Sequence, residues 1–187
     1  MAITPLILRQ LPIKRRGLTE FSFSRFLVPW LCEFKGLALF LDADMVVTGD
    51  IAELFEHAGM NAVSVMQDQP KFELASAMLF NCGACKTLTP EYIDNPANKL
   101  FDLAWAPYVG KIPPEWNHCV GYMEPKEAKL YHYTQGLPCF FETRGLPEDV
   151  VWDEEKKAAL HTVGWRELMG KAVHAEPVLR RMLERYK

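Results

Sequence analysis

Two aspartates, Asp42 and Asp44, stand one residue apart at the end of an apolar run, "LALFL", at residues 37–41. Side chains at positions i and i+2 leave a strand on the same side, so both carboxylates are expected to face one site. Two like charges this close stay ionised cheaply only when a cation lies between them. The pair therefore predicts a divalent cation, Mg²⁺ or Mn²⁺, because hard cations take oxygen ligands and keep positions for substrate phosphates.

Three interpretations of this pair are open from residue types alone. The aspartates could cap the turn before the next helix, although Asp50, followed by Glu53, already supplies a capping box there. An Asp-x-Asp pair also serves nucleotide-sugar transferases, where the metal bridges the donor diphosphate. The letters "DADMVV" satisfy the pattern of haloacid-dehalogenase-like phosphatases too, with Asp42 as the nucleophile, but the downstream acidic motif that these enzymes need does not follow Asp50.

The elements that must position the pair alternate between strand and helix patterns. Strands are expected at residues 5–9, 37–41, 61–66, 75–81 and 128–134, and helices at 19–34, 50–59, 89–94, 95–105 and, with a break near Pro177, from 148 onward. Thr89, followed by Pro90, is expected to cap the helix at 89–94. The run at 37–41 is too apolar for a strand with one face in water, which favours a strand buried on both faces. We expect an α/β fold with a mixed, largely parallel sheet flanked by helices and a helical C-terminal tail. Ligands collect at the carboxyl ends of the strands in such sheets, which is where Asp42 and Asp44 stand.

Composition limits the classes of function. The chain has 187 residues, 49% of them hydrophobic, which is enough for a sizeable core. A net charge of −3 gives no electrostatic footprint for nucleic acid. No apolar stretch reaches the roughly 18 residues of a transmembrane span, and no secretory signal opens the chain, so we expect a cytoplasmic protein. The five cysteines are expected to be reduced, and the C-x-x-C at Cys82 and Cys85 to be buried thiols.

Five segments read together resemble glycosyltransferase family 8 and its relatives of the GT-A fold. They are "SRFLVPWL", "LALFLDADMVV", "ASAMLFN", "PPEWN" and "LYHYTQGLPCF", which occur in the family's order between about residues 4 and 141. The resemblance implies a Rossmann-like nucleotide-diphospho-sugar transferase domain at residues 1–145, followed by a helical extension at 146–187. It also implies that the chain starts after the family's N-terminal nucleotide-binding segment.

The resemblance assigns roles to individual residues. Asp42, Asp44 and His132 would be the three protein ligands of one Mn²⁺ or Mg²⁺. Arg25, Ala43 and Gly136 would contact the donor. The donor would be a nucleotide-diphosphate sugar, and a UDP-sugar is the first expectation. The enzyme implied is a hexosyltransferase-type glycosyltransferase that acts with retention on a saccharide, lipid or protein acceptor. A homo-oligomer is also compatible with the sequence.

Two further positions are candidates for chemistry on the sugar. Asp68 follows the strand expected at 61–66 and would reach the sugar or the acceptor. Ser76 stands where many family members have glycine, and its hydroxyl could replace a missing sugar contact, since Leu74 occupies the usual asparagine position. No catalytic residue is assigned beyond these two candidates.

The sequence also departs from the family in the segment that binds phosphate. The usual "K-P-W" is Leu137-Pro138-Cys139 here, so the phosphate-binding lysine is missing from its place. A non-catalytic scaffold of the GT-A fold, or a fragment that depends on a partner, is therefore the alternative to an active transferase. The phosphatase is the third hypothesis.

Overall fold

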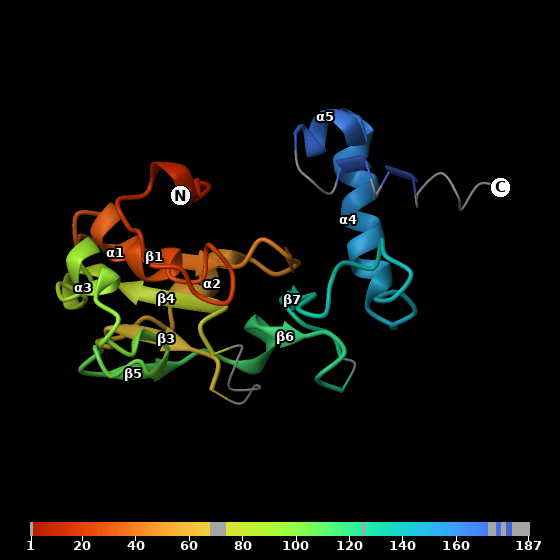
Figure 1. Ribbon diagram of the computed structural model, residues 1–187. Helices are drawn as coiled ribbons and strands as arrows, with labels where there is room; N and C mark the ends of the chain where they lie inside the picture. Colours follow the sequence, from red (N-terminus) through yellow and green to blue (C-terminus); the bar gives the residue numbers. More distant parts are fainter. Residues whose placement is uncertain (1, 68–73, 125, 172–174, 177–178, 181–187) are drawn as a thin grey trace. The chain divides into compact units, whose positions relative to one another are not determined.

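The computed structural model describes residues 2–67, 74–124, 126–171, 175–176 and 179–180. The chain divides into two compact units (Figure 1). The first consists of the residues up to Asp42 together with Asp50–Trp116, and the second of Ala43–Gly49 together with the residues from Asn117 on. The domain boundary expected at residue 145 stays a prediction; by compactness alone, the residues on both sides of it belong to the second unit.

A four-stranded sheet forms the centre of the first unit. Its strand order is β1-β4-β3-β5, with β1 at Leu37–Leu41, β4 at Ala77–Asn81, β3 at Val63–Val65 and β5 at Val109–Lys111. β4 pairs antiparallel with both β1 and β3, whereas β3 and β5 run parallel. In the register of β1 and β4, Leu39 lies opposite Leu79. The strand predicted at 37–41 is confirmed, and Asp42 follows it directly.

The expected α/β fold with a mixed sheet is confirmed, but "largely parallel" is wrong for the described strands. Three of the five strand pairings are antiparallel. A continuous apolar run fits any strand covered on both faces and carries no information on direction. The expectation that residues 37–41 are buried on both faces is also wrong, because β1 lies at the end of the sheet and is half-buried, with Leu37 46% exposed. The covered strand is β4, whose first four residues are buried.

The helices of the first unit are short. They are α1 at Val28–Leu31, α2 at Ile51–Phe55 and α3 at Pro90–Asp94, with single 3-10 turns at Leu8–Gln10, Ser24–Leu27, Cys82–Ala84, Leu100–Asp102 and Pro114–Trp116. The predicted caps are confirmed: the Asp50 carboxylate accepts a hydrogen bond from Ala52 N, and the Thr89 hydroxyl accepts one from Tyr92 N.

Three predictions about local structure are wrong in this unit. The helix expected at 95–105 is absent, and only the 3-10 turn at Leu100–Asp102 forms there. Residues 5–9 form no strand, because Leu8–Gln10 turn tightly. The long helix expected at 19–34 is reduced to a 3-10 turn and α1. Pro29 in the first turn of α1 has no N–H to bond to the preceding turn, and left-handed backbone at Glu33 (φ 52°) and Phe34 (φ 55°) ends the helix.

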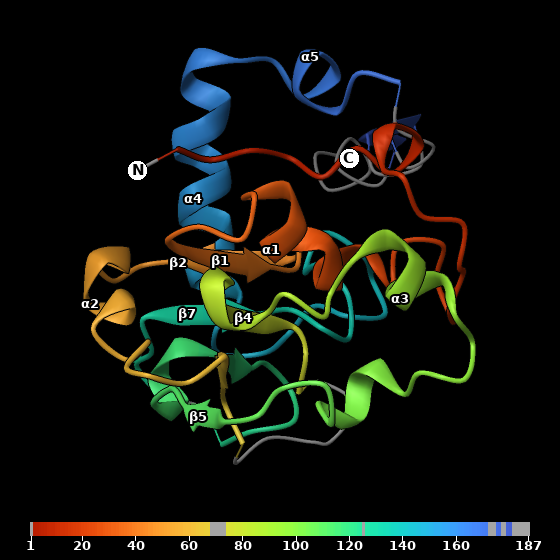
Figure 2. The same cartoon turned by 90° about the vertical axis from the view of Figure 1, so that its left-hand side faces the viewer.

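The second unit combines a small sheet with the longest described helix. Its strand order is β2-β7-β6, with β2 at Met45–Val47, β7 at Leu130–His132 and β6 at His118–Cys119. β2 and β7 are antiparallel, and β6 and β7 are parallel. Helix α4 at Asp149–Thr162 and the short α5 at Trp165–Met169 follow along the chain (Figure 2). The predicted helical tail is thus confirmed, with its break at Val163 and Gly164; the break expected near Pro177 lies outside the described residues.

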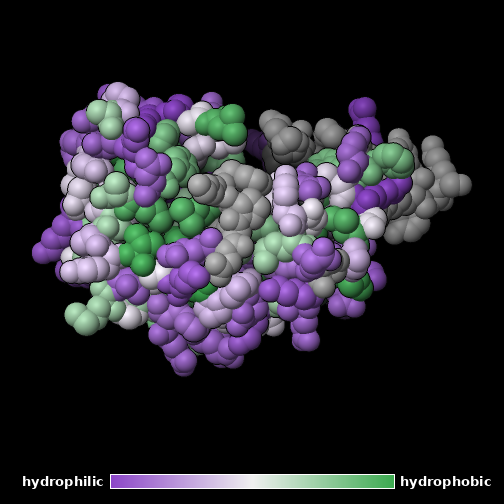
Figure 3. All heavy atoms as spheres, turned by 90° about the horizontal axis from the view of Figure 1, so that it is seen from below, coloured by the Kyte–Doolittle hydropathy of each residue, from purple (hydrophilic) through white to green (hydrophobic). Residues whose placement is uncertain are grey.

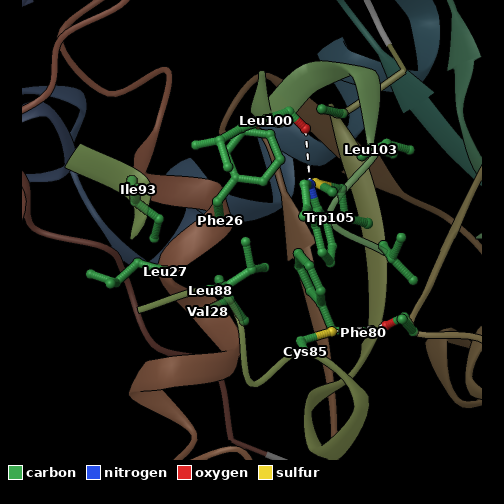
Figure 4. Packing of buried hydrophobic residues seen from close by; sticks show 14 of the residues in the cluster. Phe26, Leu27, Val28, Phe80, Cys85, Leu88, Ile93, Leu100, Leu103 and Trp105 are labelled. Atoms are coloured by element: carbon green, nitrogen blue, oxygen red, sulfur yellow. Dashed lines mark hydrogen bonds between the residues drawn. The ribbon is translucent and has the colours of Figure 1, made fainter. Parts of the chain in front are cut away.

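Aromatic side chains fill the core of the first unit. The ring of Phe26 packs edge-on against Trp105, with 6.2 Å between ring centroids, and Trp105 stacks on Phe80 at 6.3 Å. The indole N–H of Trp105 donates a hydrogen bond of 2.9 Å to the carbonyl oxygen of Leu100 (Figure 4). This bond satisfies the polar atom of a large buried ring, so the indole adds apolar area without an unpaired donor.

The face of the molecule in Figure 3 is mostly hydrophilic, with hydrophobic residues between the hydrophilic ones. Some apolar side chains, such as Leu18 and Met60, are almost fully exposed. Single exposed apolar residues are normal in folded proteins. None of the described helices is long and apolar enough to cross a membrane.

Phe26 provides the first test of this core. Phe26→Ala removes a fully buried ring and is expected to lower the free energy of unfolding by about 3–5 kcal/mol. Leu18→Ala removes an exposed side chain and should change it by less than about 0.5 kcal/mol. Urea unfolding followed by tryptophan fluorescence measures both. A loss below about 1 kcal/mol for Phe26→Ala would contradict the packing described.

The cysteine pair provides the second test. Burial, and then the neighbouring Cys32 thiol, raises the pKa of Cys82 from 9.0 to about 12; burial, and then Cys82, does the same for the pKa of Cys85. The unfolded chain therefore releases these protons first, and the free energy of unfolding should fall as pH rises from about 9 to 12. Replacing both residues by alanine should flatten that dependence, measured by urea unfolding at several pH values. An unchanged slope would show that other groups cause it.

Candidate metal centre

Asp44 and His132 meet through the pairing of two strands in the second unit. Asp44 precedes β2, and His132 ends β7 opposite Met45. The backbone N–H of Tyr133 donates a 3.0 Å hydrogen bond to the carbonyl oxygen of Asp44, which extends the ladder by one step. As a result, Asp44 Oδ1 lies 3.4 Å from His132 Nε2. The imidazole is buried, whereas the carboxylate keeps 39% of its surface exposed.

Asp42 is fixed separately, by contacts within the first unit. Its backbone N–H donates to the carbonyl oxygen of Ser76 at 3.1 Å, which continues the β1–β4 ladder past the end of β1. Arg25 Nη2 donates to Asp42 Oδ1 at 3.0 Å, and Arg25 Nη1 donates to the carbonyl oxygen of Ala75 at 2.7 Å. The Arg25 guanidinium also lies 5.1 Å from the ring centroid of Phe40. The arginine that the sequence assigned to the donor thus holds the first aspartate.

The three predicted ligands form one set of donor atoms. Asp42 is joined to Asp44 through Ala43 alone, so covalent geometry keeps their Cα atoms within about 7 Å. Asp42, Asp44 and His132 each offer one ligand atom, and these atoms lie within 4.8 Å of one another. Two carboxylate oxygens and one imidazole nitrogen suit Mn²⁺ or Mg²⁺ and leave coordination positions for other oxygen ligands. The residues therefore fit a divalent cation.

The other predicted site residues lie in different surroundings. Ala43 is exposed, and Ser76 is fully buried beside the end of β1. Gly136 has a φ of +118°, and a Cβ atom there would come within 3.0 Å of Thr143 Cγ2. The turn thus requires glycine at this position for backbone reasons. Asp68 lies outside the described residues. The roles of Arg25, Ala43 and Gly136 toward a donor stay predictions.

A buried polar network lies next to the ligand strand, and sequence reasoning missed most of it. Glu148 Oε1 is 3.0 Å from His118 Nε2, and both side chains are almost completely buried. The Tyr133 hydroxyl donates to the carbonyl oxygen of Glu148 at 2.8 Å, and burial raises the pKa of Tyr133 above its usual value. No local sequence pattern connects His118 with Glu148, thirty positions later.

Comparisons with known proteins identify the fold and the family of the chain. No family model matches the chain. Among solved structures, the glycosyltransferase GlyE of Streptococcus pneumoniae TIGR4 superposes with a TM-score of 0.54 at 17% identity over 91% of this chain. The chain spans about half of GlyE, 47% of its length. An active-site mutant of LgtC superposes with a TM-score of 0.51 at 12% identity, over 80% of this chain and 71% of LgtC.

These likenesses and one closer relative define the fold and the family. The two structures show that the chain has the GT-A-like α/β fold of glycosyltransferases. Protein CDI of Arabidopsis thaliana is 32% identical to the chain over 177 aligned residues, which cover 74% of this chain and 68% of the relative. At this identity and coverage, the chain belongs to the family of Protein CDI.

Proposed function

We propose that the protein is a metal-dependent glycosyltransferase that moves a sugar from a nucleotide-diphosphate donor to an acceptor. The observation that carries this proposal is the set of Asp42, Asp44 and His132 on a fold shared with glycosyltransferases. UDP-sugar as the donor, membership of glycosyltransferase family 8 and retention of the anomeric configuration follow from the sequence resemblance. A saccharide, lipid or protein would be the acceptor.

The chain's own residues would bind and orient the donor. Asp42 and Asp44 supply carboxylate oxygens, and His132 supplies Nε2 from a buried ring, so the three hold one side of the coordination sphere. When bound there, Mn²⁺ or Mg²⁺ offsets the negative charge of a leaving diphosphate. The exposed surface of Asp44 leaves this ligand accessible to solvent and substrate.

Arg25 has a defined part in this proposal. It holds Asp42 Oδ1 with one amino group and a main-chain carbonyl with the other, which fixes the carboxylate relative to β1 and β4. A guanidinium held by two partners loses little further freedom when a ligand binds, which favours a pre-organised site. The same positive charge would attract the donor diphosphate.

Metal binding can be tested without substrate. The parent should bind Mn²⁺ with Asp44-dependent affinity, because Asp44 offers the carboxylate nearest to His132. Asp44→Asn should raise the dissociation constant by about tenfold or more, since even the outer-shell partners of metal ligands act on that scale. Electron paramagnetic resonance of free Mn²⁺ measures the binding.

Asp50→Asn is the matched control for this titration. It makes the same chemical change six residues away, and asparagine caps a helix as well as aspartate does. Affinity and stability should therefore stay at parental values. Equal weakening in both variants would mean that Mn²⁺ senses only the general negative charge of this segment.

Donor binding is the test of the transferase itself. In the presence of Mn²⁺, a nucleoside diphosphate should raise the melting temperature of the parent, because binding to the native state at 100 times the dissociation constant adds about 2.7 kcal/mol to stability. The rise should disappear without metal and in Asp44→Asn. Release of UDP from a panel of UDP-sugars, with and without sugar acceptors, then measures turnover.

The other outcomes identify the alternatives. Mn²⁺ binding without any response to nucleotides would indicate the non-catalytic scaffold that the missing lysine at Leu137-Pro138-Cys139 suggests. Phosphate release from generic phosphate esters that needs Asp42 would favour the haloacid-dehalogenase-like hypothesis. Either result would overturn the proposed transfer reaction.

A further inference from the structure

Glu148 is a buried carboxylate that the proposed reaction does not use. It stands immediately before α4 and is only 5% exposed. Its side chain makes no capping hydrogen bond to the helix. Instead, Oε1 reaches His118 Nε2 at 3.0 Å, and the ring of His118 is completely buried. A carboxylate is costly to bury, so its direction toward one histidine calls for an explanation.

Glu148 determines how the His118 ring lies. Among the described residues, Nδ1 of this ring has no hydrogen-bond partner, so Glu148 is the polar group that orients it. The other described contact of the ring is edge-on packing against Tyr131, with 5.7 Å between ring centroids. Tyr131 belongs to β7 and lies directly opposite His118 in the register of β6 and β7.

The same strand pair carries the proposed metal ligand. Cys119, next to His118, lies opposite His132, and the backbone N–H of Val120 donates to the carbonyl oxygen of His132 at 2.9 Å. Only Cys119 therefore separates His118, whose side chain Glu148 holds, from Val120, which hydrogen-bonds to the backbone of His132. A shift of β6 would move that backbone with it.

A second connection runs from Glu148 to Asp44. The main-chain oxygen of Glu148 accepts the hydroxyl hydrogen bond of Tyr133, and the backbone N–H of Tyr133 bonds to the carbonyl oxygen of Asp44. Tyr133 is itself almost completely buried. Glu148 is thus connected through one residue to Asp44 and through β6 to His132.

We propose that Glu148 is a positioning residue of the metal centre, which sets the distance between Asp44 and His132 by holding His118 and Tyr133. This inference rests on the proposed function, because it presupposes that Asp44 and His132 bind a cation. Outer-shell partners of ligands tune affinity by fixing geometry, and their loss usually costs 10- to 100-fold in affinity. The carboxylate acts through its position and not through its charge on the metal.

Two substitutions separate position from charge. Glu148→Gln keeps the length of the side chain and an oxygen that accepts from His118 Nε2–H, but removes the charge. Glu148→Asp keeps the charge but withdraws the oxygen by one methylene group. The proposal predicts that Glu148→Asp raises the Mn²⁺ dissociation constant by about tenfold, whereas Glu148→Gln stays within about threefold of the parent. Circular dichroism confirms that each variant is folded.

Ala158→Gly is the control for a loss of stability alone. Ala158 is an exposed residue inside α4, ten positions after Glu148, and glycine in a helix interior costs about 1 kcal/mol relative to alanine. Its Mn²⁺ affinity should be parental. Should Glu148→Asp fail to fold, Tyr133→Phe takes its place, because it removes the hydroxyl that bonds to the carbonyl oxygen of Glu148 and keeps the ring; a severalfold weaker affinity is expected, by the same outer-shell argument.

Each remaining outcome overturns the proposal. If Glu148→Gln weakened Mn²⁺ binding while Glu148→Asp kept the parental affinity, the charge of Glu148 would act on the metal electrostatically. Equal weakening by Ala158→Gly would show an effect of general stability, and parental affinity in Glu148→Asp, or in Tyr133→Phe if that variant is used, would show no coupling. In these three cases, the parent still binds Mn²⁺ through Asp44, and the proposed function stands. A parent that binds no Mn²⁺ would overturn both.

Discussion

The electrostatic repulsion between Asp42 and Asp44 is the constraint on which the rest of this site depends. Two carboxylates one residue apart at the end of a strand cannot both stay ionised at low cost without positive partners. The structure gives each of them a different partner: Arg25 lies 3.0 Å from Asp42, and His132 lies 3.4 Å from Asp44. A guanidinium can only donate hydrogen bonds, whereas an imidazole nitrogen can also bind a cation, so Asp44 and His132 form the side of the pair that could share a cation.

The two aspartates are therefore held in position in different ways. Asp42 is mostly buried, and one of its oxygens is occupied by a guanidinium that also bonds to Ala75. Asp44 is more exposed and depends on the strand pair β2–β7 for its position. The first aspartate is therefore pre-organised by a side chain, whereas the second is pre-organised by backbone register. A one-residue slip of β7 would turn His132 to the other face of its strand and break the set.

The sequence could place Asp42, Asp44 and His132 in one set because the aspartates are neighbours in the chain and the histidine stands in a distinctive segment. The strand at 37–41 is bounded by Gly36, with a φ of +69°, and by Asp42, so its limits could be read directly. Strand direction could not be read, because apolar content reports coverage and not orientation. The helix at 19–34 was overestimated, because its apolar spacing arises from a 3-10 turn and α1, which Pro29 and two left-handed residues shorten.

The supporting network could not be predicted, for a different physical reason. A buried hydrogen-bonded pair such as that of His118 and Glu148 leaves no periodic pattern, and a glutamate at the start of a helix is equally expected in solvent, where its charge interacts favourably with the helix dipole. Only the three-dimensional arrangement shows that Glu148 points away from the helix end and into the sheet. Since α4 begins at Asp149, directly after this carboxylate, the helical region beyond residue 145 contributes a contact to the same unit that holds Asp44 and His132. A buried charge retained at this junction is costly for stability alone, which favours a role in fixing geometry.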